Sequence, residues 1–302
     1  MLPTAAHADD GHVDPGRVVE AARRAEAAGF DGVYVGDHLL HPRPLLESIV
    51  TLSVVAASTQ RVSLGPCVVL LALRNPVVLA KQLGTLASFA PGRLRVGVGV
   101  GGEYPAEFEA VGVPLTERGR RLEEGLRAVQ GLLSGRISPS SPDGAAVTIA
   151  PQGGEIPFLL AGWKDVALRR AARYGDGWIG YLLDPDGFAR RRSFLSDRRD
   201  ELRLASEPFT TGMLLPVHVD TASNGAQVRA AAAWAALTQK DTSFPERLFV
   251  AGSVGQVVEH LHRYWEAGCT ELMLGPTDQG AGYLEQVDLL SEKVLPEIRS
   301  FA

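Results

Sequence analysis

The sequence predicts an α/β fold, a single (β/α)8 TIM barrel, and three observations support this prediction. Strand-like and helix-like segments alternate almost from end to end of the 302 residues. Most strand-like segments are continuous apolar runs, which indicate a parallel sheet covered by helices on both faces. About eight such segments are found when a stub at residues 1–3 is included, and this number favours a closed barrel over an open sheet. The chain begins where this first strand should end, so we expect the first strand to be short.

The first half of the chain supplies the elements up to residue 133. A helix is expected over residues 14–28, with Asp14 as its N-cap, Pro15 in its first turn and Gly29 at its C-terminal end. Thr116 is expected to cap the last helix of this half. The segments after the first helix are a strand over 32–36, a helix over 45–58, a strand over 62–71, a helix over 76–89, a strand over 94–99 and a helix over 116–133.

Two insertions interrupt the alternation in the second half. Residues 134–155 are rich in Ser, Pro and Gly, and only 147–149 are strand-like, so we interpret them as an inserted excursion. Residues 239–250 form a second insert. The other segments are strands over 157–161, 177–180, 209–219 and 271–274, and helices over 165–174, 185–204, 224–237, 253–267 and 281–299. One domain is therefore expected over residues 1–302, with these two insertions.

Composition and charge exclude several classes of function. The net charge of −5 provides no basic surface for nucleic acid. No run of about 18 apolar residues predicts a membrane span, and no export signal is evident at the N-terminus. The two cysteines, Cys67 and Cys269, suggest no disulfide framework. We therefore expect a cytoplasmic protein that works on a small molecule, without nucleic acid or membrane.

Polar residues that follow the predicted strands are the candidates for chemistry, because barrel enzymes build their sites at the carboxyl ends of the strands. Asp37 and His38, directly after the strand over 32–36, are the strongest candidates among these polar residues. A histidine in this place can donate to a cofactor or pass a proton near neutral pH. The alternative is a structural pair in which Asp37 caps the next loop and both residues bond local backbone.

A run of glycines ends the strand over 94–99. Gly97, Gly99, Gly101 and Gly102 follow one another at short spacing, and glycine allows a ligand or another backbone to approach closely. The run is not followed at once by a helix, so it does not match the Rossmann fingerprint. It predicts a wall of a binding site without identifying the ligand.

Other residue patterns argue against metal or nucleophilic chemistry. Cys67 has no cationic neighbour in the sequence, so a buried and inert thiol is expected. No metal-binding spacing occurs among the seven histidines, and His7, Asp9, Asp10 and His12 only mimic a metal cluster in an N-terminal loop. The arginines at 190–192 and 198–199 are expected on a solvated helix face. These absences suit an enzyme whose bound cofactor carries the reaction.

Several motifs together resemble the bacterial luciferase-like flavin and deazaflavin oxidoreductases. They cover nearly the whole chain apart from the two insertions, and they are specific for the family rather than for one reaction. The matching segments are 25–38 (AEAAGFDGVYVGDH), 74–82 (RNPVVLAKQ), 91–108, 112–119, 174–178 (YGDGW), 251–253 (AGS) and 267–270 (AGCT).

This resemblance implies a cofactor, coenzyme F420 or FMN, at the carboxyl end of the barrel. Asp37 and His38 match an Asp-His pair that lies beside the ring in the F420 branch, where it can shuttle a proton. Cys67 and Val68 match a position where that branch often has a non-prolyl cis peptide behind the ring. The other residues implied in cofactor binding are Gly99, Val100, Gly101 and Gly102, which would line the cofactor, and Ala161, Gly162 and Trp163, whose backbone N–H groups would face its phosphate near a helix N-terminus.

One departure from the family bears on the substrate. Some deazaflavin sugar dehydrogenases have a Glu directly after these glycines, whereas here Gly102 takes that place and Glu103 follows. No lysine near Tyr181 is available to hold a substrate phosphate. The resemblance therefore does not extend to sugar-phosphate dehydrogenation.

Three functions remain open at this point. The favoured one is an F420-dependent oxidoreductase that transfers hydride to or from a small organic substrate, with His38 as the acid. The first alternative is an FMNH2-dependent monooxygenase that uses O2 and receives its reduced flavin from a separate reductase. For the favoured F420-dependent function, the corresponding partner is a separate F420 reductase. The second alternative is a non-catalytic flavin-fold protein. The family also implies a homodimer packed through the helices around 45–58 and 76–89.

Overall fold

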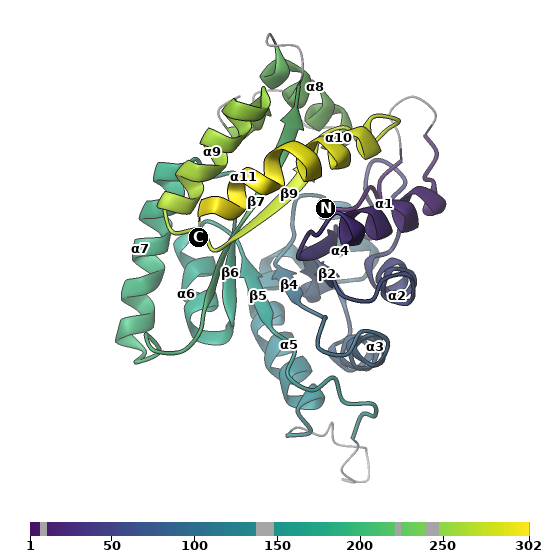
Figure 1. The fold of residues 1–302 in the computed structure, drawn as a ribbon. Helices are drawn as coiled ribbons and strands as arrows, with labels where there is room; N and C mark the ends of the chain where they lie inside the picture. Colours follow the sequence, from purple (N-terminus) through teal and green to yellow (C-terminus); the bar gives the residue numbers. More distant parts are fainter. Residues whose placement is uncertain (7–10, 137–147, 221–224, 239–247, 302) are drawn as a thin grey trace.

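The computed structural model describes residues 1–6, 11–136, 148–220, 225–238 and 248–301. Strands gather in the middle of the molecule and helices surround them (Figure 1). The strands are β1 (Gly32–Val35), β2 (Ser63–Pro66), β3 (Val69–Leu70), β4 (Val96–Gly99), β5 (Phe158–Ala161), β6 (Gly177–Tyr181), β7 (Thr210–Val219), β8 (Val250–Gly252) and β9 (Glu271–Pro276). The α-helices are α1 (Pro15–Ala27), α2 (Ser48–Ser58), α3 (Pro76–Phe89), α4 (Pro105–Ala110), α5 (Arg118–Leu133), α6 (Asp165–Tyr174), α7 (Pro185–Glu201), α8 (Ala226–Thr238), α9 (Val254–Glu266), α10 (Tyr283–Leu289) and α11 (Leu295–Ile298).

Local sequence signals explain why the longer helices begin where they do. Asp14 accepts hydrogen bonds from the N–H groups of Gly16 and Arg17 at the start of α1, and Asn75 does the same for α3. Ser253 and Gln256 form a reciprocal capping box at the start of α9. A proline occupies the first turn of α1, α3 and α7, where its missing N–H costs nothing.

All the strand pairs are parallel, as expected for repeated βα units. β1 pairs with β2, and a second sheet has the order β3-β4-β5-β6-β7-β8 with β9 paired to β7. An isolated parallel bridge between Leu64 and Leu94 connects the two sheets. The N-terminal residues lie between β9 and β1: the Met1 amino group donates to Leu274 O at 2.7 Å, and Leu2 N donates to Tyr34 O at 2.7 Å. The circle of strands thus continues from β9 to β1, in the α/β barrel arrangement that the sequence predicts.

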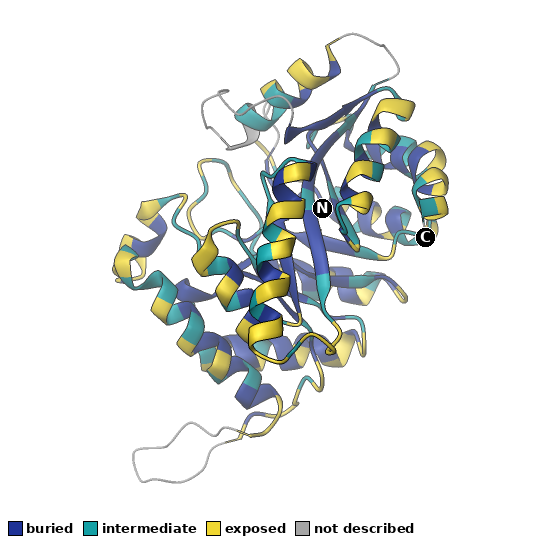
Figure 2. Ribbon diagram, turned by 90° about the vertical axis from the view of Figure 1, so that its left-hand side faces the viewer, coloured by how far each residue is buried: buried dark blue, intermediate teal, exposed yellow. Residues whose placement is uncertain are grey.

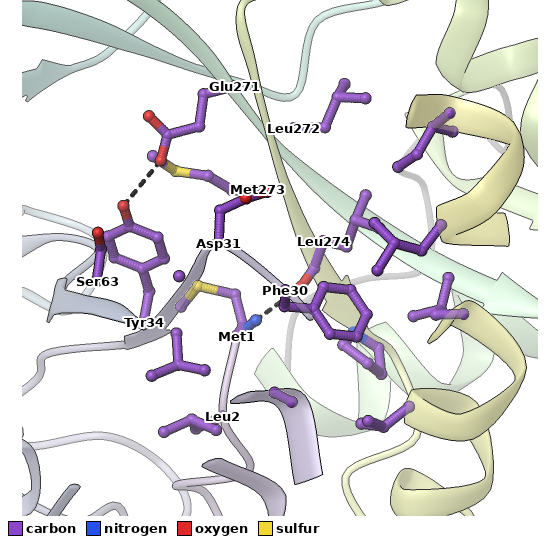
Figure 3. A pocket seen from close by; sticks show the side chains of 18 of the residues that line it. Met1, Leu2, Phe30, Asp31, Tyr34, Ser63, Glu271, Leu272, Met273 and Leu274 are labelled. Carbon is purple, nitrogen blue, oxygen red and sulfur yellow. Dashed lines mark hydrogen bonds between the residues drawn. The ribbon is translucent and has the colours of Figure 1, made fainter. Parts of the chain in front are cut away.

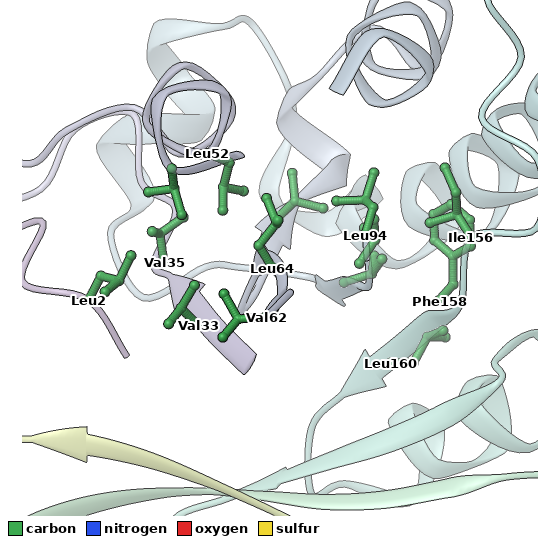
Figure 4. Packing of buried hydrophobic residues seen from close by; sticks show 14 of the residues in the cluster. Leu2, Val33, Val35, Leu52, Val62, Leu64, Leu94, Ile156, Phe158 and Leu160 are labelled. Carbon is green, nitrogen blue, oxygen red and sulfur yellow. The ribbon is translucent and has the colours of Figure 1, made fainter. Parts of the chain in front are cut away.

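The main core lies between the outer face of the strands and the surrounding helices. Figure 2 shows buried residues along the strands and on the inward faces of the helices, with exposed residues on the outer faces. Val33 and Val35 of β1 pack with Leu52 of α2 and with Leu64 of β2 (Figure 4). The alternate residues of the same strands, such as Tyr34, Leu159 and Ile179, form a smaller cluster with Cys67 inside the barrel. Successive side chains of a strand point to opposite faces of the sheet, and both faces of this sheet are buried, so these strands contribute to both clusters.

Several predicted bounds are wrong. The strand over 62–71 is interrupted between β2 and β3, and the helix over 45–58 begins only at Ser48 because Leu45 forms an antiparallel bridge with Ala5. Thr116 does not cap α5, since it lies inside a 3-10 turn that precedes Arg118. At the end of the insert at 239–250, the structure has a strand, β8 (Val250–Gly252), that the sequence did not predict.

The remaining predictions concern the insertions and the arginine-rich helix. Residues 148 and 149 are not in a strand, while residues 137–147 and 239–247 of the two insertions lie outside the described residues. The solvated face predicted for the arginines of α7 is wrong for Arg199. Its guanidinium is buried, donates to the carbonyls of Leu204 and Glu207, and lies 4.0 Å from the centre of the Phe209 ring. No described helix combines the length and the apolar character needed to cross a bilayer.

Candidate active site

Two cavities lie at opposite ends of the barrel. One of about 370 Å³ lies at the amino ends of the strands, between β1 and β9, where Met1 separates Tyr34 from Leu274 (Figure 3). The other, of about 180 Å³, lies at the carboxyl ends and is lined by His38, Cys67, Tyr104 and other residues. Although it is smaller, we place the candidate active site there, because barrel enzymes carry their chemistry at the carboxyl ends of the strands.

This inner cavity opens toward a shallow depression of about 550 Å³. Residues 38–45 and 104–106 line the depression. His38, His41, Leu45 and Tyr104 line both spaces and therefore form the boundary between them. The three rings of His38, His41 and Tyr104 contact one another, with centroid distances of 5.0–5.4 Å. The mouth of the inner cavity is thus built from two imidazoles and a phenol.

A buried carboxylate orients His38. The Nδ1 atom of His38 lies 3.1 Å from Oε2 and 3.3 Å from Oε1 of Glu107, which projects from α4 and is completely shielded from solvent. The same carboxylate accepts hydrogen bonds from the N–H groups of Leu39 and Leu40, at 2.6 and 3.2 Å. Burial alone would raise the pKa of Glu107, but the hydrogen bond and charge of His38 and these two N–H groups outweigh it and hold the pKa below its ordinary value.

Ionised Glu107 fixes the tautomer of His38. A carboxylate without a proton can only accept, so the Nδ1 atom of His38 must carry the hydrogen in this bond. The Nε2 atom is then left to hold or release a proton on its other side. This arrangement is the one that acid–base histidines need, with a group that orients the ring behind it.

Asp37 is turned away from the cavity and holds the fold together. Its carboxylate accepts hydrogen bonds from Ser48 Oγ at 2.9 Å, Leu70 N at 2.9 Å and Arg74 Nη2 at 2.6 Å. Arg74 also contacts Glu47 Oε1 at 2.9 Å. Asp37 therefore ties β1 to the start of α2 and to the segment after β3. These partners are distant in the sequence, so Asp37 has a structural role that differs from the local backbone bonds of the alternative interpretation, and it does not line the cavity.

The glycines that line open space differ from those the sequence singled out. An added Cβ at Gly36 meets no atom within 4 Å, and Gly36 lines the inner cavity. An added Cβ at Gly97 would lie 2.7 Å from the backbone oxygen of Pro66, and one at Gly99 would lie 2.4 Å from a methyl carbon of Val68, so other parts of the protein fill the space beside these two glycines. That Gly99 lines the cofactor stays a prediction. Neither Val100, Gly101 nor Gly102 lines either space at the carboxyl ends.

The peptide bond between Cys67 and Val68 is cis, as the resemblance implies. Cys67 lines the inner cavity, and its Sγ atom lies 3.8 Å from Met273 Sδ inside the barrel. Burial raises the pKa of its thiol to about 12, so the thiol stays protonated and does not act as a nucleophile at neutral pH.

The backbone N–H of Gly162 is not available to a phosphate. It donates to Ile179 O at 3.1 Å, and Gly162 O accepts from the indole of Trp178 at 2.7 Å. Ala161, Gly162 and Trp163 do not line the two spaces at the carboxyl ends. The backbone groups left for an anion in this part are N–H groups at the start of α6, apart from that of Ala167, which donates to Lys164 O at 2.8 Å.

Of the predicted site residues, the structure brings His38 and Cys67 together at the inner cavity. The sequence analysis did not identify Glu107, His41, Trp234 or Tyr181 as members of the site. One signal could have pointed to Glu107. It is a glutamate directly before Phe108, and the structure places both residues on the buried side of the short helix α4. Among the described residues, no group of three or more His, Cys, Asp or Glu side chains is placed to hold a metal ion.

Comparisons with known proteins support the family suggested by the motifs. A family model for luciferase-like monooxygenases matches residues 1–244. An uncharacterized protein of Mycobacterium tuberculosis is 32% identical over 216 residues, which cover 63% of this chain and 74% of the relative. The F420-dependent glucose-6-phosphate dehydrogenase of Tsukamurella paurometabola is 34% identical over 180 residues, which cover 55% of this chain and 53% of that enzyme.

Two solved structures share the fold. An F420-dependent secondary alcohol dehydrogenase in complex with an F420-acetone adduct superposes with a TM-score of 0.80, at 19% identity, and the match covers 95% of this chain and 96% of that one. The oxygenating constituent of 3,6-diketocamphane monooxygenase from Pseudomonas putida, in complex with FMN, has a TM-score of 0.72 at 16% identity, with 98% of each chain covered. Together with the family match over most of its length, this shows that the chain belongs to the luciferase-like monooxygenase family and is an oxidoreductase.

Proposed function

We propose that this protein is an F420-dependent oxidoreductase that moves a hydride between the deazaflavin ring and a small organic substrate. The observation that carries the proposal is the pair of His38 and Glu107 at the mouth of the inner cavity. When a hydride moves to or from a carbon that bears oxygen, a proton must move to or from that oxygen. An oriented histidine can supply or accept this proton. The F420-dependent relatives support this choice of cofactor.

The residues around the inner cavity fit a flat ring. The cavity reaches bare backbone at Gly36, where a side chain would project into the open space. Cys67 lines one wall, and Pro216 and Gly275 from neighbouring strands add uncharged surface. Apolar walls with a few oriented polar groups are typical of cofactor sites.

The chain's own residues would handle the proton. When bound, F420 supplies or accepts a hydride at carbon 5 of its ring. His38 holds or takes the proton at Nε2, while Nδ1 stays bonded to Glu107, and Asp37 keeps the strand end that carries His38 in place. We assign the phosphate of the cofactor to the N-terminus of α6, where the N-cap residue Lys164, two residues after Gly162, adds a positive charge. The acidic residue of the first turn, Asp165, is paired with Arg191.

An FMN-dependent monooxygenase is the second candidate, favoured by the fold shared with an FMN complex. Such an enzyme would receive reduced FMN from a separate reductase. A titration of the purified protein with F420 and with FMN, followed by cofactor fluorescence, separates the two. We expect F420 to bind at micromolar concentration and FMN more weakly. Tight binding of FMN without binding of F420 would exclude the first candidate.

The variant His38→Ala tests the acid–base role. We expect turnover with reduced F420 to fall by about 10²-fold or more while the affinity for F420 changes little. His262→Ala is the matched control, because His262 is a half-exposed histidine on α9. Unchanged turnover in His38→Ala would rule out the role.

We also propose a homodimer. Val50 and Val54 of α2 and Val77 and Val78 of α3 are exposed apolar side chains on two neighbouring helices, and a second copy would bury them. We place the protein in the cytoplasm, supported by two cysteines that are both buried and free.

A further inference from the structure

We propose that the inner cavity, on its side formed by Tyr181, Trp234 and Leu214, takes a neutral, largely apolar carbonyl compound, or the matching alcohol, and rejects substrates that carry a phosphate or carboxylate. The wall with Gly36 and Cys67 is left to the cofactor ring. This inference rests on the proposed F420-dependent function and names its substrate class. It is drawn from the lining of the cavity, in three steps.

The first step concerns the apolar surface of the inner cavity. Tyr181 at the end of β6 and Trp234 of α8 have ring centroids 6.3 Å apart, which leaves no room for a ligand ring between them, so they form one continuous wall. Leu214 and Pro216 of β7 line the same cavity, and Tyr104 lies at its mouth. A surface of this kind binds a molecule by burial of apolar area rather than by charge.

The second step concerns charge. No lysine or arginine is found among the described residues that line the inner cavity, whereas one carboxylate, that of Glu103, is. Arg74, which lies behind this region, is engaged with Asp37 and Glu47. Arg43 lines only the outer depression and donates to Ala6 O. Met1 also lines the cavity, but its amino group donates to Leu274 O, and burial lowers the pKa of that group to about 6. When His38 carries a proton on both ring nitrogens, Glu107 balances its charge. A phosphate in the inner cavity would therefore lose its hydration without gaining an unpaired cation, and would face Glu103 instead.

The third step concerns the hydroxyl groups. Burial, and then the charges of Glu103 and Glu107, raise the pKa of Tyr104 to about 12. Burial, and then the charges of Glu103 and the Tyr104 phenol, raise the pKa of Tyr181 as well. Both phenols therefore remain protonated at neutral pH and can donate to a carbonyl oxygen. Burial also lowers the pKa of His41, which keeps that imidazole neutral.

The reaction on such a substrate is balanced by groups already named. In the reducing direction bound reduced F420 would supply a hydride to the carbonyl carbon as the carbon–oxygen π bond breaks, and the oxygen would take the proton from Nε2 of His38. The products would be the alcohol and oxidised F420, whose ring would release its remaining proton to solvent, and His38 would regain its proton from solvent. The reverse direction consumes the alcohol with His38 as the base.

Benzamide and benzoate test the inference, because they have the same shape and differ in charge. Each is titrated into the protein, with and without bound F420, while tryptophan fluorescence is followed. The variant Trp234→Phe removes the fluorescence change that arises at the cavity wall. Trp265→Phe, at the opposite end of the barrel, is the matched control and should keep that change. Glu103→Gln removes the negative charge while keeping the side-chain shape. Glucose 6-phosphate is titrated in the same way.

We expect benzamide to bind at least about tenfold more tightly than benzoate, and Glu103→Gln to narrow this ratio by strengthening benzoate alone. We also expect no response to glucose 6-phosphate. Equal binding of the two probes, a response to glucose 6-phosphate, or no binding of benzamide at millimolar concentration would each overturn the inference. The binding of F420 is measured separately. If F420 does not bind, the proposed function is contradicted, while the ratio of the benzamide and benzoate affinities still decides the charge preference of the cavity.

Discussion

Glu107 and His38 are 69 residues apart in the chain, and their side chains form a hydrogen bond of 3.1 Å in which the carboxylate is fully buried. The bond joins the loop after β1 to helix α4. Because the same carboxylate also accepts the N–H groups of Leu39 and Leu40, it fixes the backbone that follows His38 as well as the imidazole ring. Glu107 thus acts as a positioning residue behind the candidate acid.

The variant Glu107→Gln tests this relationship. The N–H groups of Leu39 and Leu40 keep the amide oxygen at the position of Oε1, so the glutamine NH2 faces His38 Nδ1. His38 Nδ1 then becomes the acceptor, and Nε2 carries the hydrogen. We expect turnover to fall by about 10²-fold or more, as for other histidines held in the wrong tautomer. The change of tautomer is read directly from the nitrogen shifts of His38 in a ¹⁵N NMR spectrum.

Glu109→Gln is the control for that experiment, because Glu109 is an exposed glutamate on the same short helix. It should leave both turnover and the spectrum of His38 unchanged. A Glu107→Gln protein with wild-type turnover, or with the wild-type tautomer, would contradict the positioning role.

A second prediction concerns the buried ion pair of Asp37 and Arg74. Arg74→Met leaves the Asp37 carboxylate buried without its cation, and we expect the free energy of unfolding to fall by about 3–5 kcal/mol. The double variant Arg74→Met with Asp37→Asn should recover part of this loss, because it removes the unpaired charge. Both values come from urea denaturation. Arg120→Met, at an exposed arginine of α5, should leave stability unchanged, and a loss there comparable to that of Arg74→Met would show that the effect is not specific.

The third prediction separates two glycines by what surrounds them. Gly99→Ala places a Cβ 2.4 Å from Val68 Cγ2, so we expect a loss of about 1–3 kcal/mol in stability that Val68→Ala partly restores. Gly36→Ala meets no neighbour within 4 Å, so stability should stay within about 0.5 kcal/mol while the affinity for F420 falls. Urea denaturation and a fluorescence titration measure the two effects. If Gly99→Ala instead weakened F420 binding at unchanged stability, the glycine run would line the cofactor after all.

The comparison of the two glycines also shows what the sequence can and cannot predict. Local signals fixed the bounds of α3 and α6, because an N-cap, a proline in the first turn or a following glycine acts within a few residues. The end of the first predicted strand placed His38 at the site, and the resemblance to the family placed Cys67 there. Glycine spacing could not show whether the space beside Gly99 is filled, since Val68 reaches it from the segment between β2 and β3. The pairing of His38 with Glu107 is likewise a tertiary contact that no local pattern encodes.

A fourth prediction concerns the pH dependence of stability through Glu26. Its carboxylate accepts the N–H groups of Gln60, Arg61 and Val62. Burial alone would raise its pKa, but these bonds and the charge of Arg61 outweigh burial and hold the pKa below its ordinary value. A group whose pKa is lowered on folding stabilises the protein above its unfolded pKa, of about 4.3 for glutamate, and that contribution is lost as the pH falls through the folded pKa.

Glu26→Gln should therefore be less stable than the wild type by about 1 kcal/mol at pH 7, and the difference should shrink as the pH falls below about 4.3. Urea denaturation between pH 7 and pH 3 provides the measurement. Glu259→Gln, an exposed glutamate on α9, is the control and should track the wild type at every pH. A gap between Glu26→Gln and the wild type that stays constant down to pH 3 would show that the three hydrogen bonds do not depend on the charge.

The fifth prediction concerns the proposed dimer. Val54 is half exposed on α2, next to the exposed valines of α3, and Val54→Glu would place a charge in the middle of this apolar surface. If a second copy covers the surface, the free energy needed to bury that unpaired charge exceeds the free energy released by the apolar contact. The mass measured by light scattering should therefore drop from two chains to one. Val166→Glu, at a similarly exposed valine on α6, is the matched control and should leave the mass unchanged. A dimer that survives Val54→Glu but is lost in Val166→Glu would move the interface to α6, where it would also cover the helix N-terminus that we assign to the cofactor phosphate.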